Sequence, residues 1–176
     1  VKIRGGMTKL YTDVNVVTSL GSAKIKGTIK NPIDAKNASF DLAINTNSVN
    51  LGTIMQMPDK LGMFTGSFTA KGHGFDPATA NANFDGVINN ITLNKYNYKN
   101  IRLKGSIANK QFNTIASIKD ANIDLNLTAS GFFTNKFPSL HLVANVDSIK
   151  TQPLNLTPQA FLYHGKIVAD FASTDP

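Results

Sequence analysis

Strict alternation of apolar and polar residues is the strongest pattern in this chain. It runs through residues 122–128 (NIDLNLT) and returns at residues 24–30, 39–45 and 100–107. Successive side chains of a strand point to opposite faces of a sheet, so each segment predicts a half-buried strand with one apolar and one polar face. Weaker versions of the pattern predict further strands at residues 11–18, 63–72, 80–89, 111–119, 139–147 and 164–172.

The segments between these strands are short and rich in turn residues. They include Asn31-Pro32, Asn89-Asn90 and Ala108-Asn109-Lys110. Short connections favour antiparallel neighbours, so we expect one long antiparallel sheet in which each strand pairs with the next. Residues 48–57 and 156–162 break the alternation, and each is expected to form a short helix or a loop.

The chain resembles itself at an offset of about 100 residues. The segment Ser39–Asn45 aligns with Ser139–Asn145, and Pro58 aligns with Pro158 after an irregular stretch in both copies. Repetition at a fixed period is typical of elongated folds whose units cover one another's ends. We therefore expect a partial unit at residues 1–38, a repeat unit at 39–138 and a partial repeat at 139–176.

A sheet with one apolar face must cover that face with a second sheet, with a helix, or by curling so that the face lines its own trough. No long amphipathic helix is predicted. A β-sandwich therefore remains the alternative to a long curled antiparallel sheet with an apolar inner face.

Alternation also predicts which side chains line such a trough. A bulge of one residue would reverse the facing of every side chain that follows it. The expected lining is Ile25, Ile29, Phe40, Leu42, Ile44, Phe68, Phe84, Ile101, Leu103, Ile107, Ile115, Ile123, Leu125, Leu127, Leu140, Leu142, Ile167 and Phe171.

The charged residues do not change this interpretation. The chain of 176 residues has 18 Lys+Arg against 11 acidic residues, all Asp, and a formal net charge of +7. The absence of Glu disfavours a mostly helical protein. The lysines are scattered rather than clustered on one element with aromatic residues, so we expect a solvated polar face, at most weakly attracted to anionic headgroups, and no nucleic acid partner.

No catalytic or metal-binding pattern emerges. The chain has no Cys, and His73, His141 and His164 lie in separate segments without the spacing of metal ligands. The aspartates fall on exposed strand positions or in turns, and the glycine-containing segments lack the spacing of a phosphate-binding loop. We expect a protein that is not an enzyme and that uses no cofactor and no metal.

Three segments carry a resemblance to a known family. Thr18–Gly27, Leu93–Gly105 and the block from Asn47 to Asp76 resemble the strand–Gly–strand pattern of AsmA-like and TamB (translocation and assembly module) proteins of Gram-negative envelopes, most closely the Bacteroidetes type. The resemblance covers most of the chain and lies in the pattern rather than in an invariant motif.

This resemblance implies a periplasmic sheet curled into an open trough, often called a β-taco. It also implies an inner-membrane-anchored parent protein of which this chain is a fragment. The groove would carry phospholipid acyl chains between the inner and outer membranes, and the parent would support outer-membrane protein assembly with a barrel partner.

Two other functions remain open. One is a scaffold that binds outer-membrane protein strands by β-augmentation. The other is a closed β-sandwich that acts as an adhesin or binds carbohydrate. Unpaired strands at the two ends of the sheet also predict end-to-end self-association of the fragment.

Overall fold

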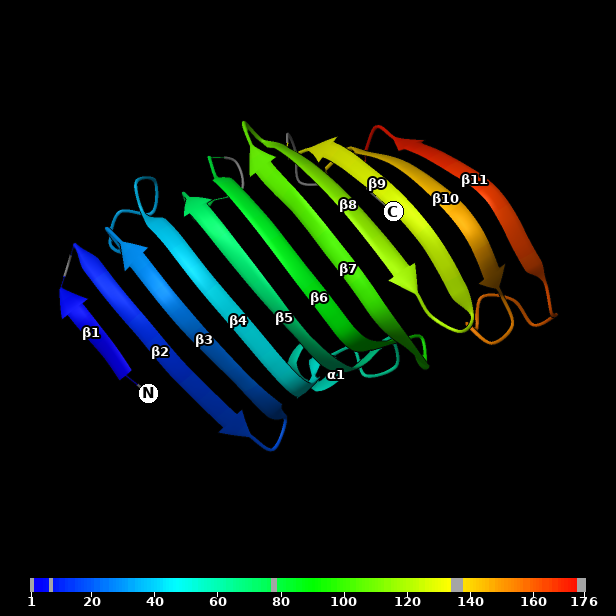
Figure 1. Ribbon diagram of the computed structural model, residues 1–176, viewed down its shortest axis with the longest axis horizontal. Coiled ribbons are helices and arrows are strands. Elements are labelled where there is room, and N and C mark those ends of the chain that lie inside the picture. The colour runs from blue at the N-terminus through cyan, green and yellow to red at the C-terminus, as the bar shows by residue number, and fades with distance from the viewer. Residues whose placement is uncertain (1, 7, 77–78, 134–137, 174–176) are drawn as a thin grey trace.

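A computed structural model describes residues 2–6, 8–76, 79–133 and 138–173 of the protein. Within these residues the fold is one antiparallel sheet of eleven strands, and each strand pairs with its neighbours in sequence (Figure 1). The strands are β1 (Lys2–Gly6), β2 (Lys9–Thr18), β3 (Gly21–Lys30), β4 (Ser39–Asn50), β5 (Leu61–His73), β6 (Asn81–Leu93), β7 (Tyr96–Ala108), β8 (Gln111–Lys119), β9 (Ile123–Phe132), β10 (Leu140–Lys150) and β11 (Leu162–Phe171).

Two tight turns show how the sequence sets this topology. Asn94 and Lys95 join β6 to β7, and Asn109 and Lys110 join β7 to β8, all four with positive φ between 47° and 67°. Two successive left-handed residues make the turn whose twist matches that of the flanking strands, and Asn tolerates this conformation well. These turns keep neighbouring strands adjacent and antiparallel.

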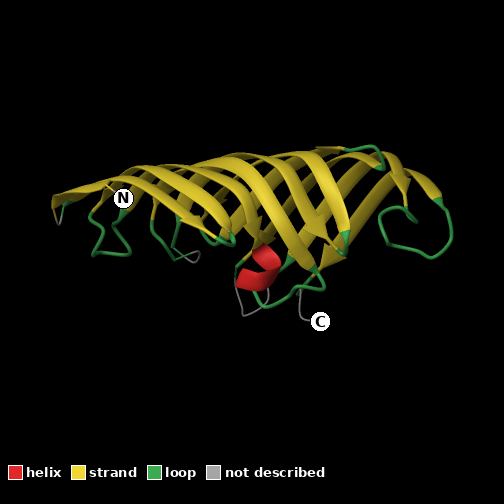
Figure 2. Cartoon of the chain, turned by 90° about the horizontal axis from the view of Figure 1, so that it is seen from below, coloured by secondary structure: helices red, strands yellow, loops and turns green. Residues whose placement is uncertain are grey.

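The sheet is a single layer that does not close on itself. Figure 2 shows it arching over the short helix α1 (Leu51–Ile54). Within the described residues no second sheet packs against it, so the long antiparallel sheet predicted from the sequence is confirmed and the sandwich is not the observed fold. No helix among these residues is long and apolar enough to cross a membrane.

The strand register gives the sheet two chemically distinct faces. Residues directly opposite in neighbouring strands share a face, so a face can be followed from pair to pair. One unbroken row of apolar residues and glycine crosses ten strands, from β2 to β11: Val14, Ile25, Ile44, Phe68, Gly86, Leu103, Ala116, Leu127, Ala144 and Ile167. We call the side that carries this row the apolar face and the opposite side the polar face.

Among the described residues, most of the apolar face lies outside a buried core. Only one cluster of buried apolar residues is found in the described part of the chain, and it lies at the β9–β10 end around Leu125, Val146 and Leu154. The protein exposes 11043 Å², whereas a compact monomer of 19.0 kDa would expose about 8,400 Å². The excess follows from a sheet with both sides open.

The two segments that break the alternation differ from each other. After residues 48–50 complete β4, Asn50 caps α1 by accepting the Thr53 N–H on its side-chain oxygen at 3.0 Å. Residues 156–161 form an irregular loop, and Leu162 already begins β11. The first strand, β1, was not predicted, because its glycines leave no alternation to detect.

A local irregularity recurs along the sheet. The β4–β5 pairing shifts register between Thr46 and Val49, and the β10–β11 pairing shifts between Val146 and Ile149, about 100 residues further on. The recurrence is compatible with the predicted repeat. The unit boundaries at residues 38/39 and 138/139 stay predictions, and residues 134–137 beside the second boundary lie outside the described ones.

Candidate functional site: the apolar face

The structure places seventeen of the eighteen predicted lining residues on the apolar face. Most of them lie in three adjacent rows across the sheet, in which Ile25 is opposite Ile44, Leu42 is opposite Ala70, and Ile29 is opposite Phe40. On β9 and β10 the face continues through Leu127 and Leu142.

Ile115 is the exception, and its placement is a correction. It lies opposite Lys104 on β7 and Thr128 on β9, which are polar-face residues. Its side chain is 56% exposed. It lines a hollow of about 540 Å³ over β6–β10, together with Arg102, Lys104 and polar-face residues of β6, β9 and β10.

Exposure of the predicted residues varies along the sheet. Ile123 and Leu125 are buried, at 7% each, whereas Ile167 and Phe171 on the last strand are exposed. The other thirteen residues on the apolar face are half-buried, because each contacts its neighbours within the layer but meets solvent above it.

The half-buried state of these side chains is what a single-layer sheet produces. A closed core would bury most of them completely.

Phenylalanine rings lie over glycines of neighbouring strands on the apolar face. A Cβ added to Gly86 would stand 2.3 Å from the Phe68 ring, and one added to Gly105 would stand 2.5 Å from the Phe84 ring. Each Phe is directly opposite its Gly in the register. Because glycine leaves room for the ring, these aromatic side chains cover the adjacent backbone and contribute a continuous apolar surface.

One end of the apolar face is covered by the connection between β10 and β11. Leu154 in this connection is 0% exposed and packs into the cluster that contains Ile123 and Leu125. The amide of the Asn155 side chain donates to the Asn94 carbonyl oxygen at 2.9 Å, which ties the connection to the β6–β7 turn. The covered region therefore ends near β7, and the apolar face of β2–β6 lies outside this cluster.

A polar network supports the same end of the sheet. The Tyr96 hydroxyl donates to the Asp120 carboxylate and accepts from the Asn122 amide at 3.1 Å. Burial, followed by the hydrogen bond to Asp120, raises the pKa of Tyr96. Burial also raises the pKa of Tyr98, whose ring meets that of Tyr96 edge to face at 4.8 Å.

Sequence reasoning missed several residues of the apolar face. Among them are Val14, Ile88, Phe112, Ile118 and Val146, each of which pairs with a predicted lining residue or with an apolar-face glycine. Phe112 is informative, because it lies opposite Gly131 and its ring would meet a Cβ there at 2.7 Å. Alternation within β8 did not select the face of Phe112, because Ile115 at an odd position is apolar as well.

The histidines do not converge. His141 Nδ1 lies 2.5 Å from Asp170 on the polar face, and His164 contacts the Asp147 carbonyl oxygen. His73 lies opposite Ser39 and Asn81 at the far end of β5. In the described part of the chain no group of three or more His or Asp side chains could hold a metal ion.

The fold and this face define the protein as an open, single-layer antiparallel β-sheet with one apolar side. Comparisons with protein-family models, with curated proteins and with solved structures gave no match.

Proposed function

We propose that the apolar face binds lipid acyl chains, and that the protein is a segment of a periplasmic AsmA/TamB-like conduit that carries phospholipid between the two membranes of a Gram-negative envelope. The observation that carries this proposal is the unbroken apolar row across ten strands, whose part on β2–β6 lies outside the buried cluster formed by the described residues. At about 4.8 Å per strand, that row is about 43 Å long.

Dispersed, non-directional contacts suit a mobile chain. Each methylene that leaves water for an apolar surface gains about 0.8 kcal/mol when it is fully covered, and about half of that on an open face. A long acyl chain would gain several kcal/mol without a fixed pose. The flat Phe rings over Gly86 and Gly105 favour such sliding, because they reduce the pleat that a chain must cross.

The decisive experiment compares two neighbouring residues of β4. Leu42 lies on the apolar face opposite Gly27 and Ala70, and Ala43 lies on the polar face opposite Lys26 and Thr69. The protein is purified without detergent, extracted with organic solvent and analysed by mass spectrometry. Phospholipid should accompany the wild type and Ala43→Asp, and should be lost from a folded Leu42→Asp variant.

Equal lipid content in the two variants would contradict the assignment of the apolar face. Leu42 is a better probe than Leu125, because Leu125 is buried in the covered cluster and its replacement would also disturb folding. Circular dichroism of both variants establishes that the sheet persists.

A further inference from the structure

We propose that the polar face of β1–β3 docks onto an anionic membrane surface. The basic patch consists of the cationic side chains on this face of the three strands: Lys2, Arg4, Lys9, Lys24, Lys26 and Lys30. The inference stands on charge and exposure alone, so it can fail while lipid binding on the apolar face succeeds, and the reverse also holds.

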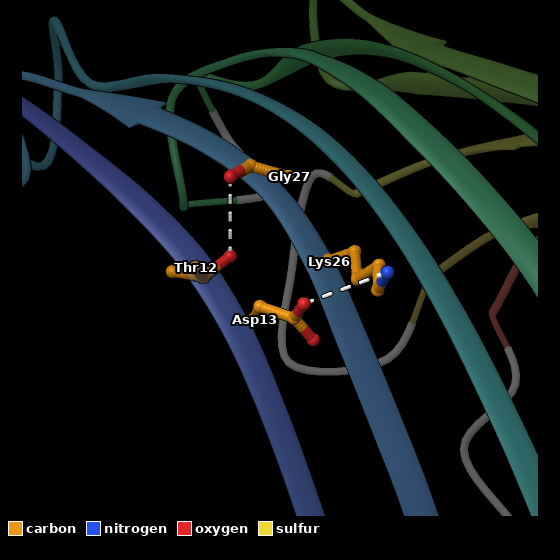
Figure 3. A network of polar contacts seen from close by, with 4 residues as sticks. All are labelled: Thr12, Asp13, Lys26 and Gly27. Atoms are coloured by element: carbon orange, nitrogen blue, oxygen red, sulfur yellow. Dashed lines mark hydrogen bonds and ion pairs between the residues drawn. The ribbon is translucent and has the colours of Figure 1, made fainter. Parts of the chain in front are cut away.

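The basic patch has little internal compensation. Asp13 is the only acidic residue of β1–β3, and its carboxylate lies 3.5 Å from Lys26 Nζ (Figure 3). None of the other five cations has an ion-pair partner within the described ranges. Five positive charges therefore remain on one side of three strands.

The register brings two of these charges together. Lys9 and Lys30 lie directly opposite each other on β2 and β3. Like charges at directly opposite positions destabilise a sheet. Lys9 Nζ turns to the Tyr11 ring, 4.6 Å from its centroid, which satisfies one cation and leaves Lys30 exposed. An anionic partner on this face would remove the repulsion.

The remaining side chains favour a membrane over a nucleic acid. Tyr11 and Val17 are 50% and 73% exposed on the same face. Tyr and small apolar side chains beside lysines suit the boundary between headgroups and acyl chains. Proteins that bind single-stranded nucleic acid instead stack the bases on free aromatic rings. Tyr11 is the one aromatic residue of β1–β3, and its ring is already in contact with Lys9.

The other end of the polar face provides a matched control. Arg102 and Lys104 on β7 and Lys166 on β11 are exposed cations on the same side of the sheet. Replacing these three with Gln removes the same charge as the triple replacement Arg4→Gln, Lys24→Gln and Lys30→Gln. Any difference between the two variants reports position rather than net charge.

The test is sedimentation with vesicles of phosphatidylcholine alone or mixed with phosphatidylglycerol, at low ionic strength. We expect binding only to the anionic vesicles. Each basic side chain near such a surface strengthens binding about fivefold, so the Arg4/Lys24/Lys30 variant should bind on the order of a hundredfold more weakly. The control variant should bind like the wild type, and salt should weaken wild-type binding.

Several outcomes would overturn the proposal. They are equal losses in the two triple variants, binding that ignores phosphatidylglycerol, and tighter binding to a single-stranded oligonucleotide than to vesicles. A variant with Lys24→Arg and Lys30→Arg keeps the charge and should keep vesicle binding, which separates electrostatic docking from a folding defect. Leu42→Asp should retain vesicle binding, which separates this proposal from the lipid-binding one.

Discussion

The same substitution should have two different costs at the two ends of the apolar face. Leu125 is 7% exposed beneath Leu154, whereas Leu42 is partly exposed on the uncovered part of the face. Replacing a fully packed Leu with Ala leaves a cavity and costs about 3 kcal/mol or more. At Leu42 solvent fills the space, so only the transfer of about three half-covered carbon groups is lost, about 1 kcal/mol.

Urea unfolding of Leu42→Ala and Leu125→Ala measures both costs. The free energy of unfolding should fall two to three times further for Leu125→Ala, about 2 kcal/mol apart by the estimates above. Equal slopes against urea concentration are required for the comparison to be valid. If Leu42→Ala costs as much as Leu125→Ala, the apolar face of β4 is covered in solution, and the argument for an open face fails.

Three further predictions concern the rest of the sheet. Gly86→Ala should destabilise the protein, because its Cβ would stand 2.3 Å from the Phe68 ring, and Phe68→Leu should restore part of the loss in thermal unfolding. Folding raises the pKa of Tyr96, so the folded state holds the phenol proton more tightly than the unfolded state does. The contribution of Tyr96 to the free energy of unfolding is therefore fully present below about pH 10 and declines as the pH rises further. Urea unfolding across that pH range should show a smaller decline for Tyr96→Phe. The exposed Ile167 on β11 should promote end-to-end association, and Ile167→Lys should reduce this association in sedimentation velocity. Equal association of the variant and the wild type would show that β11 is not the associating edge.

Local pattern was sufficient for much of the sheet. The alternation in residues 24–30, 39–45 and 122–128 predicts strands from two facts, that strands have period two and that one face is apolar. Each of these segments lies within a strand, except that Asn122 immediately precedes β9. Asn89-Asn90, expected to separate two strands, instead lie inside β6, and the turn follows at Asn94-Lys95. The expected turn at Asn109-Lys110 is found, and a connection this short leaves antiparallel neighbours as the only pairing. This is why the antiparallel order was predictable without any long-range information.

The face on which a side chain lies was harder to predict where apolar residues occupy both odd and even positions of a strand. In β8, Ile115 and the pair Phe112 and Ile118 are all apolar but lie an odd number of residues apart, so they cannot share a face. Only pairing with β9, where Phe112 lies opposite Gly131, places the even positions of β8 on the apolar face. The choice is therefore made by a cross-strand partner that alternation within β8 does not reveal.

The covered end of the apolar face depends on contacts between distant segments. Leu154 lies in a segment without periodicity, and it is buried because Asn155 bonds to the turn at Asn94 and the cluster around Leu125 receives its side chain. Nothing in the local sequence distinguishes Leu154 from Leu156, which is 53% exposed. A burial difference of this kind comes from tertiary packing, not from composition.

The two proposals assign different physical roles to the two faces of one sheet. Hydrophobic contacts on the apolar face are short-ranged and insensitive to salt, whereas the charges of the basic patch act over about 10 Å and weaken as salt is added. Thr12 and Asp13 are successive residues of β2, so their side chains lie on opposite faces of the sheet. The Thr12 hydroxyl donates to the Gly27 carbonyl oxygen at 3.3 Å, and Asp13 pairs with Lys26 of the basic patch (Figure 3). A thin sheet can thus contact a charged surface on one side while its other side stays free for acyl chains. Salt titration of vesicle binding and lipid retention should therefore separate the two activities, with binding falling and retention unchanged.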